Sequence, residues 1–253
     1  DTAWAHKQVH IIEYRGVKDS WIRNIKSFVP PTAPKSGNGK GAHLQDGGLI
    51  IRMSKRVTVA DSTLAKAQNR GSGGCGYLFE VRKSSEILFR DCTGTEGRHN
   101  FIQNWGFGAT GIVWLRVYSA EGANVVSKEL DFGLTASSEF HHSLAMANLI
   151  DSCEIHDGWA AVNRGDWSTG AGHTATETVF WNNRGAGTVR SLQFGWGYIV
   201  GSSPDLGVST DTDQLNAGGT EPEDFREGIG EGDSLWPPSL YEDQLKRRLQ
   251  GLK

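Results

Sequence analysis

The sequence has few of the features that mark several common protein classes. Its 253 residues include only three cysteines, Cys75, Cys92 and Cys153, and no Cys-x-x-C pair, so a disulfide scaffold and a zinc ribbon are excluded. With seven prolines, the 33 glycines do not form a collagen-like repeat. No apolar run approaches the roughly 18 residues that a membrane span needs. We therefore expect buried free thiols and no membrane partner.

The sequence also lacks a strong charge of either sign. Its 26 Lys and Arg residues are balanced by 29 Asp and Glu residues, which leaves a net charge of -3. No basic field is available for nucleic acid, so we predict no nucleic-acid partner. Walker, nucleophile-elbow and dinucleotide motifs are missing. Gly106, Gly108 and Gly111 lie between two predicted strands, with no helix to receive a phosphate.

A repeat of short apolar strands runs along most of the chain. Runs such as residues 49–53 and 77–81 are followed by a second run that ends in a small polar residue, as in 57–62 and 87–92. The equivalent corners are taken as Asn24, Asp61, Asp91, Val117, Ser152 and Asn182, spaced 26 to 37 residues apart. Two or three strands of about five residues fill such a repeat. That is too little for a propeller blade and suits one coil of a parallel β-helix.

The segment from Tyr77 to Cys92 resembles the coils of right-handed parallel β-helix proteins of the pectate-lyase-like superfamily. In those coils a strand turns through Ser or Asn into a second strand that ends in Asp or Asn. The resemblance covers roughly residues 8–200. It implies an all-β fold, a right-handed parallel β-helix (solenoid). The superfamily includes lyases, hydrolases, epimerases and binding proteins, so the resemblance implies an architecture more than one reaction.

The ends of the chain predict different structure. We assign the coils to residues 1–201, an irregular acidic and Gly-rich loop to 202–236, and a C-terminal capping helix to 237–253. Ser239 and Glu242 have the spacing of a capping box at the start of that helix. The loop carries acids that could gather Ca²⁺, although their spacing matches no calcium loop: Asp211, Asp213, Glu221, Glu223 and Asp224.

No amphipathic helix precedes the first predicted strand, which begins near Val9. Members of the superfamily usually carry such a helix over the first coil. We therefore expect an N-terminal segment, a partner chain or a self-contact to cover that coil. The region 30–47 is expected to be an irregular excursion.

Polar and aromatic residues gather just before the first strand of the middle coils. The candidate catalytic residues are His99, His142, Arg98, Arg164 and Glu139. The candidate substrate-binding residues are Asn100, Trp105, His141, Trp159, Asn163, Trp167 and His173. Trp rings stack on sugars, and an Arg guanidinium can pair with a uronate carboxylate. Strand alternation further predicts an outward row of Glu13, Arg52, Glu80 and Gln103.

Two reactions fit these residues. In a β-elimination, His99 or His142 removes a proton from a uronate whose carboxylate is neutralised by an arginine. Hydrolysis needs a carboxylate pair, and no spacing marks one among Glu139, Asp157 and Asp166. We therefore predict a lyase acting on an acidic polysaccharide, secreted or at the cell surface. A glycoside hydrolase and a non-catalytic carbohydrate-binding or adhesive β-helix remain alternatives.

The histidines do not by themselves predict a metal site. His141 and His142 are adjacent, and neighbouring residues of a strand face opposite sides. His99 could join either of them across coils, but a third ligand is not evident in the sequence. We therefore predict no resident metal.

Overall fold

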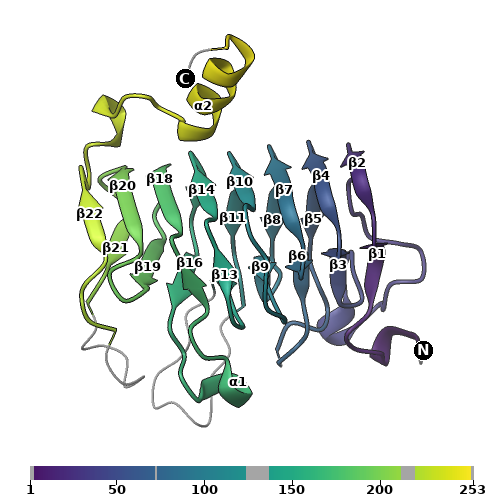
Figure 1. Cartoon of the computed structure of the whole chain (residues 1–253). Helices are drawn as coiled ribbons and strands as arrows, with labels where there is room; N and C mark the ends of the chain where they lie inside the picture. The colour runs from purple at the N-terminus through teal and green to yellow at the C-terminus, as the bar shows by residue number, and fades with distance from the viewer. Residues whose placement is uncertain (1–2, 72, 124–136, 212–219, 252–253) are drawn as a thin grey trace.

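The chain is mostly β-structure arranged in parallel sheets, as predicted (Figure 1). The computed structural model describes residues 3–71, 73–123, 137–211 and 220–251. Among these residues, all the paired strands are parallel, and each new strand is added beside the preceding member of its own sheet. The chain therefore visits the sheets in turn and adds one strand to a sheet at each visit.

Two long sheets lie face to face and a shorter one closes part of the side between them. Sheet A contains β1 (His10–Arg15), β3 (Gly47–Arg52), β6 (Tyr77–Arg82), β9 (His99–Gln103), β12 (Ser138–Phe140), β16 (Gly158–Val162), β19 (Thr188–Leu192) and β21 (Gly207–Ser209). Sheet B contains β2 (Lys18–Arg23), β4 (Lys55–Ala60), β7 (Ser85–Arg90), β10 (Val113–Leu115), β14 (Leu149–Asp151), β18 (Val179–Asn183), β20 (Tyr198–Ser202) and β22 (Phe225–Glu227). Sheet C contains β5 (Thr63–Ala65), β8 (Thr93–Thr95), β11 (Tyr118–Ala120) and β15 (Glu154–Ile155).

The remaining elements are short, apart from one helix. β13 (Ala145–Met146) pairs with β17 (Ala175–Thr176). The helical segments are η1 (Ala3–Ala5), η2 (Gly37–Gly39), α1 (Trp167–Gly170), η4 (Gly232–Ser234) and α2 (Leu240–Leu249). Within the described ranges, no helix is long and apolar enough to cross a membrane.

The core lies between the sheets and is built from stacked rows of equivalent residues. Phe79, Phe101 and Trp159 stack in one row, with ring centroids 5.1 and 5.8 Å apart. Trp114 meets this row edge-on and stacks on Phe89 at 4.2 Å. The prediction that Trp159 binds substrate is therefore wrong, because its side chain is 1% exposed and lies inside the core.

The corners after sheet B follow the predicted repeat with one shift. Asn24, Asp61, Asp91, Ser152 and Asn182 all have positive φ, which Asn and Asp tolerate best. The sixth corner is Arg116 (φ +48°) and not Val117. Apolar Val117 is buried in the core, so its neighbour takes the exposed turn position. The Arg116 amide donates to the Asp151 carbonyl, as the Asp91 amide does to that of Leu115.

The outward row predicted on sheet A has the wrong register. Glu13 and Glu80 do share a row, with Ile50 between them. Arg52 instead lies beside Arg82, and Gln103 beside Val81 of the core row. A shift of one residue exchanges the two faces of a strand, so Gln103 points inward. The row of Glu80 continues through Ile102 to Glu139.

The connections differ sharply in length between the corners. Each turn from sheet B to sheet C has two residues, at 61–62, 91–92, 116–117 and 152–153. The connections from sheet A to sheet B have two residues after β1, β3 and β6 and are longer from β9 onward, as at 104–112 and 163–178. These longer segments provide polar side chains over the outer side of sheet A, which is the side away from the core.

Two segments of the region 202–236 form strands, although an irregular loop was predicted for all of it; residues 212–219 lie outside the described structure. β21 pairs with β19 from Thr188 onward, and β22 pairs with β20 from Tyr198 onward. These strands have three residues each, too few to show periodicity in the sequence. The region therefore extends both long sheets by one strand.

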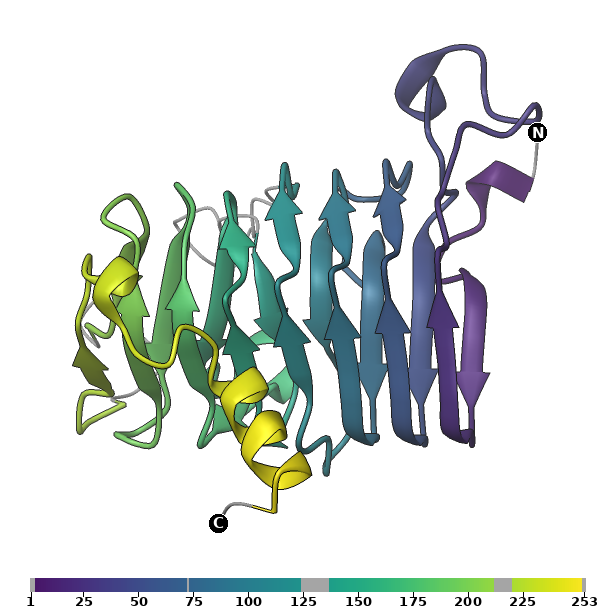
Figure 2. The ribbon, with the colours of Figure 1, turned by 90° about the horizontal axis from the view of Figure 1, so that it is seen from above.

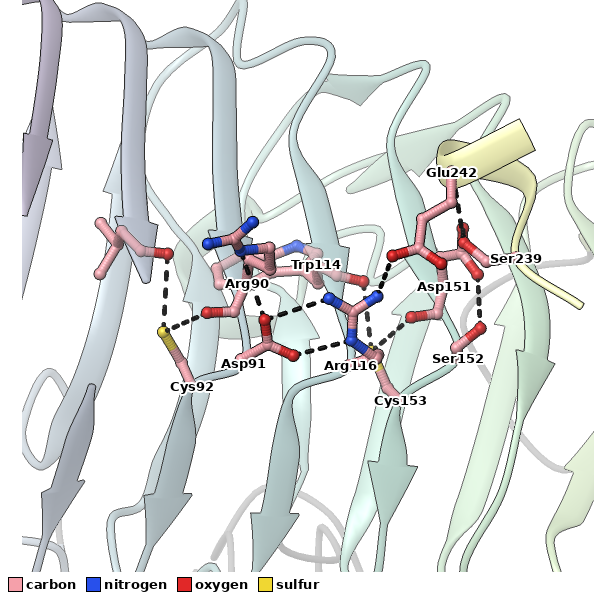
Figure 3. A network of polar contacts seen from close by, with 11 residues as sticks. Arg90, Asp91, Cys92, Trp114, Arg116, Asp151, Ser152, Cys153, Ser239 and Glu242 are labelled. Atoms are coloured by element: carbon pink, nitrogen blue, oxygen red, sulfur yellow. Dashed lines mark hydrogen bonds and ion pairs between the residues drawn. The ribbon is translucent and has the colours of Figure 1, made fainter. Parts of the chain in front are cut away.

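Helix α2 forms where it was predicted, but it does not cover the first or the last strands of the sheets. The Ser239 side chain caps it by accepting a hydrogen bond from the Glu242 amide. Figure 2 shows the helix alongside the middle strands. The Asp151 carboxylate accepts hydrogen bonds from Ser239 Oγ at 2.9 Å and from the Tyr241 amide at 2.7 Å (Figure 3). Because α2 has no buried residue, polar contacts with the sheet B corners determine its position.

At the N-terminal end of the two long sheets, β1 and β2 are edge strands in the described structure. Ile11 and Trp21 on these strands are 53% and 68% exposed. Trp4 packs beside the excursion near residues 30–47, against Ala33 and Ala42. Coverage of this end by a partner, a preceding segment or a self-contact stays a prediction.

Candidate functional site

The predicted catalytic residues lie on the outer side of sheet A, where β9, β12 and the connection after β16 meet. Glu139 occupies the outward row of β12. One of its oxygens, Oε1, lies 3.1 Å from His99 Nε2 and also contacts His141 Nδ1. The other, Oε2, accepts a hydrogen bond from Arg164 Nη2. The structure thus brings His99, Glu139, His141 and Arg164 together; we call these four residues the Glu139 cluster.

Glu139 is a buried carboxylate held in its ionised form. Its side chain is 2% exposed. Burial alone would raise the pKa of Glu139, but the guanidinium of Arg164 and the two imidazoles hold it well below its usual range. A buried charge of this kind is costly unless it is paired, and such clusters occur most often at functional sites.

His99 has one ring nitrogen bonded and one without a hydrogen-bond partner. Its Nδ1 lies 2.5 Å from the Ser137 carbonyl oxygen, which can only accept. Within the described residues, the buried Nε2 makes no hydrogen bond, since its approach to Glu139 Oε1 has the distance but not the direction of one. Burial lowers the pKa of His99 to about 3, so the ring is neutral at pH 7.

His142 lies beside this cluster and beneath an exposed aromatic ring. Its imidazole stacks on Trp105 with centroids 3.9 Å apart, and it meets the His141 ring at 4.7 Å. Burial lowers the pKa of His142 to about 4. Trp105 is 51% exposed and follows Asn104 at the same corner position that Met53 and Lys83 occupy in earlier repeats, with positive φ.

Arg98 lies near the cluster and bonds to Tyr77, which packs against His99. Arg98 Nη1 donates to the Tyr77 hydroxyl at 3.2 Å, and the Tyr77 ring lies 5.2 Å from that of His99. Burial raises the pKa of Tyr77 to about 12. The phenol therefore stays protonated at neutral pH.

A groove of about 580 Å³ lies on the same side of sheet A, next to Trp105. It is lined by Gln8, Val9, His10, Glu13, Ile50, Arg52, Gly74, Arg82, Asn104 and Trp105. Beneath it, the fully buried Glu80 contacts His10, Arg82 and Asn104. These ion pairs lower the pKa of Glu80 although burial opposes them. The groove leads to Trp105, with His142 directly behind that ring.

Several predicted substrate-binding residues have other environments. Asn100 is buried and donates to Ser119, Ala120 and Asp157, so the prediction that it contacts substrate is wrong. Asn163 accepts from the Gly165 amide in a turn. His173 packs against Phe194, and Trp167 is half-buried in α1; the contacts described for His173 do not join it to the Glu139 cluster.

The Ca²⁺ alternative finds no support at its most buried residue. Asp224 accepts hydrogen bonds from Ser191 Oγ and from the amides of Gln193, Gly195 and Gly197. Protein donors thus occupy the carboxylate oxygens that a cation would need. Asp213 lies outside the described residues.

Of the groove residues, Glu13, Arg52 and Trp105 were identified from the sequence, and the others were not. Arg82 ends β6 and Asn104 follows β9, but the error in the outward row hid their proximity to Glu80. The third ligand that a metal site needs was also overlooked. Glu139 joins His99 and His141 so that one ligand atom of each lies within 4.8 Å of the others. Imidazole and carboxylate ligands of this kind suit a divalent transition metal.

We found no match to this chain among protein-family models, curated proteins or solved structures. The chemistry of the site is therefore inferred from its own geometry. An ionised glutamate, three imidazoles and two guanidiniums lie at one end of an open groove, with an indole at the boundary.

Proposed function

We propose that the chain is a right-handed parallel β-helix of the pectate-lyase-like type and that it binds an acidic polysaccharide on the outer side of sheet A. The parallel pairing and the repeated order of the sheets support this architecture. The hand follows from the strong preference of crossovers between parallel strands for a right-handed path. A polysaccharide would then lie across successive coils.

The observation that carries the proposal is the position of Trp105 between the groove and the Glu139 cluster. One face of the indole is stacked on His142, and half of its surface is exposed. An exposed indole next to a groove suits a pyranose ring. The guanidiniums of Arg52 and Arg82 line the same groove and suit uronate carboxylates, because an arginine can bind a carboxylate in a bidentate manner.

The reaction that fits best is β-elimination at the Trp105 end of the groove. His142 would take the proton from the carbon next to the uronate carboxylate. The electrons of that C–H bond form a carbon–carbon double bond, and the glycosidic oxygen leaves and is protonated by water. Arg82 replaces Arg98 and Arg164 as the proposed neutralising cation, because it lines the groove and keeps 28% of its side chain exposed while it pairs with Glu80. The side chain of Arg164 is 10% exposed and is engaged by Glu139 and Ser168.

Hydrolysis is less well supported by the same geometry. A glycosidase needs one carboxyl group that carries a proton and a second that is ionised. Glu80 and Glu139 share a row, but each is buried in contact with an arginine and with histidine. Both carboxylates are therefore stabilised without a proton, which leaves neither as a general acid.

Binding without cleavage is the second candidate, and the burial of the site favours it. His99, Glu139 and His142 are 6%, 2% and 5% exposed. A base must come within hydrogen-bond distance of the proton it removes, so Trp105 would have to move aside for His142 to act. A binding protein requires only the groove and the exposed face of Trp105.

Incubation with a panel of polyuronates tests the proposal. A lyase should give ultraviolet absorbance from its unsaturated product, and His142→Ala should lower the rate by about a hundredfold or more, as expected for loss of a general base. Trp105→Ala should weaken retention on the substrate polysaccharide. His156→Ala is the matched control, because His156 is paired with Glu154 away from the groove.

The other possible results of these experiments distinguish the candidate functions. Retention on a polyuronate without an unsaturated product would favour the binding protein. Neither product nor retention across the panel, with the chain folded, would contradict the proposal as a whole. A folded His142→Ala variant with undiminished activity would exclude His142 as the base.

A further inference from the structure

We propose that the Glu139 cluster binds one divalent transition-metal ion through His99 Nε2, Glu139 Oε1 and His141 Nδ1. These three atoms lie within 4.8 Å of one another, on side chains that are all buried. Two imidazoles and one carboxylate are a ligand set that proteins use for Zn²⁺ when an open position is kept for water or substrate. This inference is independent of the polysaccharide, because it rests on the ligands alone.

The orientation of His99 is the first argument. Its Nδ1 lies 2.5 Å from the Ser137 carbonyl oxygen, so Nδ1 must carry the proton and donate it. Nε2 therefore carries a lone pair and no proton, and it lies 3.1 Å from Glu139 Oε1. Two acceptors at this distance repel each other, whereas a cation bound to both would stabilise them. Donation from the second ring nitrogen to a carbonyl is also how metal-bound histidines are commonly oriented.

The absence of a partner for His99 Nε2 is a separate observation. Among the described residues, this buried nitrogen makes no hydrogen bond. An unsatisfied polar atom in the interior is unfavourable and calls for an explanation. A metal ion in front of Nε2 would provide one.

The two oxygens of Glu139 have divided roles. Oε2 accepts from Arg164 Nη2, which fixes the orientation of the carboxylate. Oε1 lies beside His99 Nε2 and is in hydrogen-bond contact with His141 Nδ1, so a metal ion would replace the proton between Oε1 and Nδ1. Two ligand atoms on a tetrahedral Zn²⁺ lie roughly 3.4 Å apart, given bond lengths of about 2.1 Å. The separation of 3.1 Å between His99 Nε2 and Glu139 Oε1 is close to that value.

The charge around the site indicates what the open position would hold. Arg164 bonds Glu139, and Arg98 bonds Tyr77 next to His99. With a divalent cation present, the single carboxylate leaves an excess of positive charge. The remaining coordination positions would therefore favour an anion, such as the hydroxide that forms from metal-bound water.

Titration of the metal-free full chain with Zn²⁺, followed by calorimetry, tests this inference. We expect one Zn²⁺ per chain, and an affinity that falls by about tenfold or more in His141→Ala and in Glu139→Gln. His156→Ala should bind Zn²⁺ like the unmodified chain. The control is well matched: Glu154 and His156 have the same spacing as Glu139 and His141 and are in contact at 2.7 Å, but they are exposed.

Substitutions in the buried cluster could also prevent folding, so a measurement on the unmodified chain is needed. Co²⁺ added to that chain should give visible ligand-field bands of a site with nitrogen and oxygen ligands, and Zn²⁺ should abolish them. Lack of such bands, or equal loss of Zn²⁺ affinity in His156→Ala and His141→Ala, would overturn the proposal. Both outcomes are independent of any activity on polysaccharide.

Discussion

At the scale of single residues, small side chains at equivalent corners after sheet B donate to the backbone in the same way. Ser62 Oγ, Cys92 Sγ and Cys153 Sγ each contact the backbone carbonyl two residues earlier, at 2.7, 3.4 and 3.4 Å. A thiol and a hydroxyl thus take equivalent positions in successive repeats. Cys92 and Cys153 are buried and free, as predicted.

The environment of these thiols predicts very low reactivity. Burial raises the pKa of Cys92 to about 12 and raises that of Cys153 further, so the reactive thiolate is nearly absent at pH 8. We expect alkylation of both residues in the native chain to be at least ~100-fold slower than in denaturant. Mass spectrometry after timed exposure to iodoacetamide measures this. Rapid labelling of Cys92 in the folded chain would contradict the described packing.

The types of residue that precede the apolar strands predicted part of the candidate site. His99, Glu139, His141 and Arg164 were all selected, because several polar groups before one apolar strand are unusual. Asn100 was selected for the same reason, and Trp159 because an indole can stack on a sugar ring, but both lie in the interior. The sequence could not separate these cases, because the side to which a residue points depends on where the strand bends, and this is set by long-range pairing.

At the scale of elements, α2 depends on a buried carboxylate for its position. Asp151 accepts from Ser239 Oγ, the Tyr241 amide and Ser152 Oγ, and Arg116 extends the contact to Glu242. The sequence predicted that this helix would cap the coils. The sequence could not identify its true location, because Asp151 lies some 90 residues earlier in the chain.

Asp151 also predicts a pH dependence of stability. Burial raises its pKa above 3.8 in spite of its hydrogen bonds. The ionised form is thus disfavoured in the folded chain, so the contribution of Asp151 to stability is greatest below the unfolded pKa and falls as the pH rises through the folded pKa. The change amounts to about 1.4 kcal/mol for each unit by which the two pKa values differ.

The variant Asp151→Asn isolates this effect, since asparagine does not titrate. Relative to the variant, the unmodified chain should lose free energy of unfolding as the pH rises above 3.8 and through the raised pKa of the folded chain. Urea denaturation at a series of pH values gives both curves. A difference between the two proteins that is constant with pH, or that grows in favour of Asp151, would show that the carboxylate is not destabilised by burial.

The long strands in the middle of each sheet were largely predictable from the sequence. The short strands that end each sheet were not. β6 and β7 have six residues each with strong apolar content, so they stand out in the sequence. β21 and β22 have three residues each and pair only at the end of a sheet. Their formation depends on the neighbouring strand, which supplies the hydrogen-bond partners that local sequence lacks.

At the scale of the whole molecule, stability should decrease from the middle of the sheets to both ends. β7 has a partner on each side, whereas β2 and β22 have one described partner each. We therefore expect amide hydrogen exchange to be fastest in β1, β2, β21 and β22 and slowest in β6, β7, β9 and β10. Mass spectrometry of peptic fragments measures the order. Protection of β1 and β2 equal to that of β7 would indicate that this end is covered.

The contrast between constant and variable connections has a consequence for evolution and engineering. At the four described turns from sheet B to sheet C, each of two residues, an inserted residue would break backbone bonds to the next repeat. Beside sheet A the chain already accommodates segments of very different length. New specificities could thus be acquired by exchanging those segments alone, while the two-residue turns serve as fixed anchor points for the transplanted sequence.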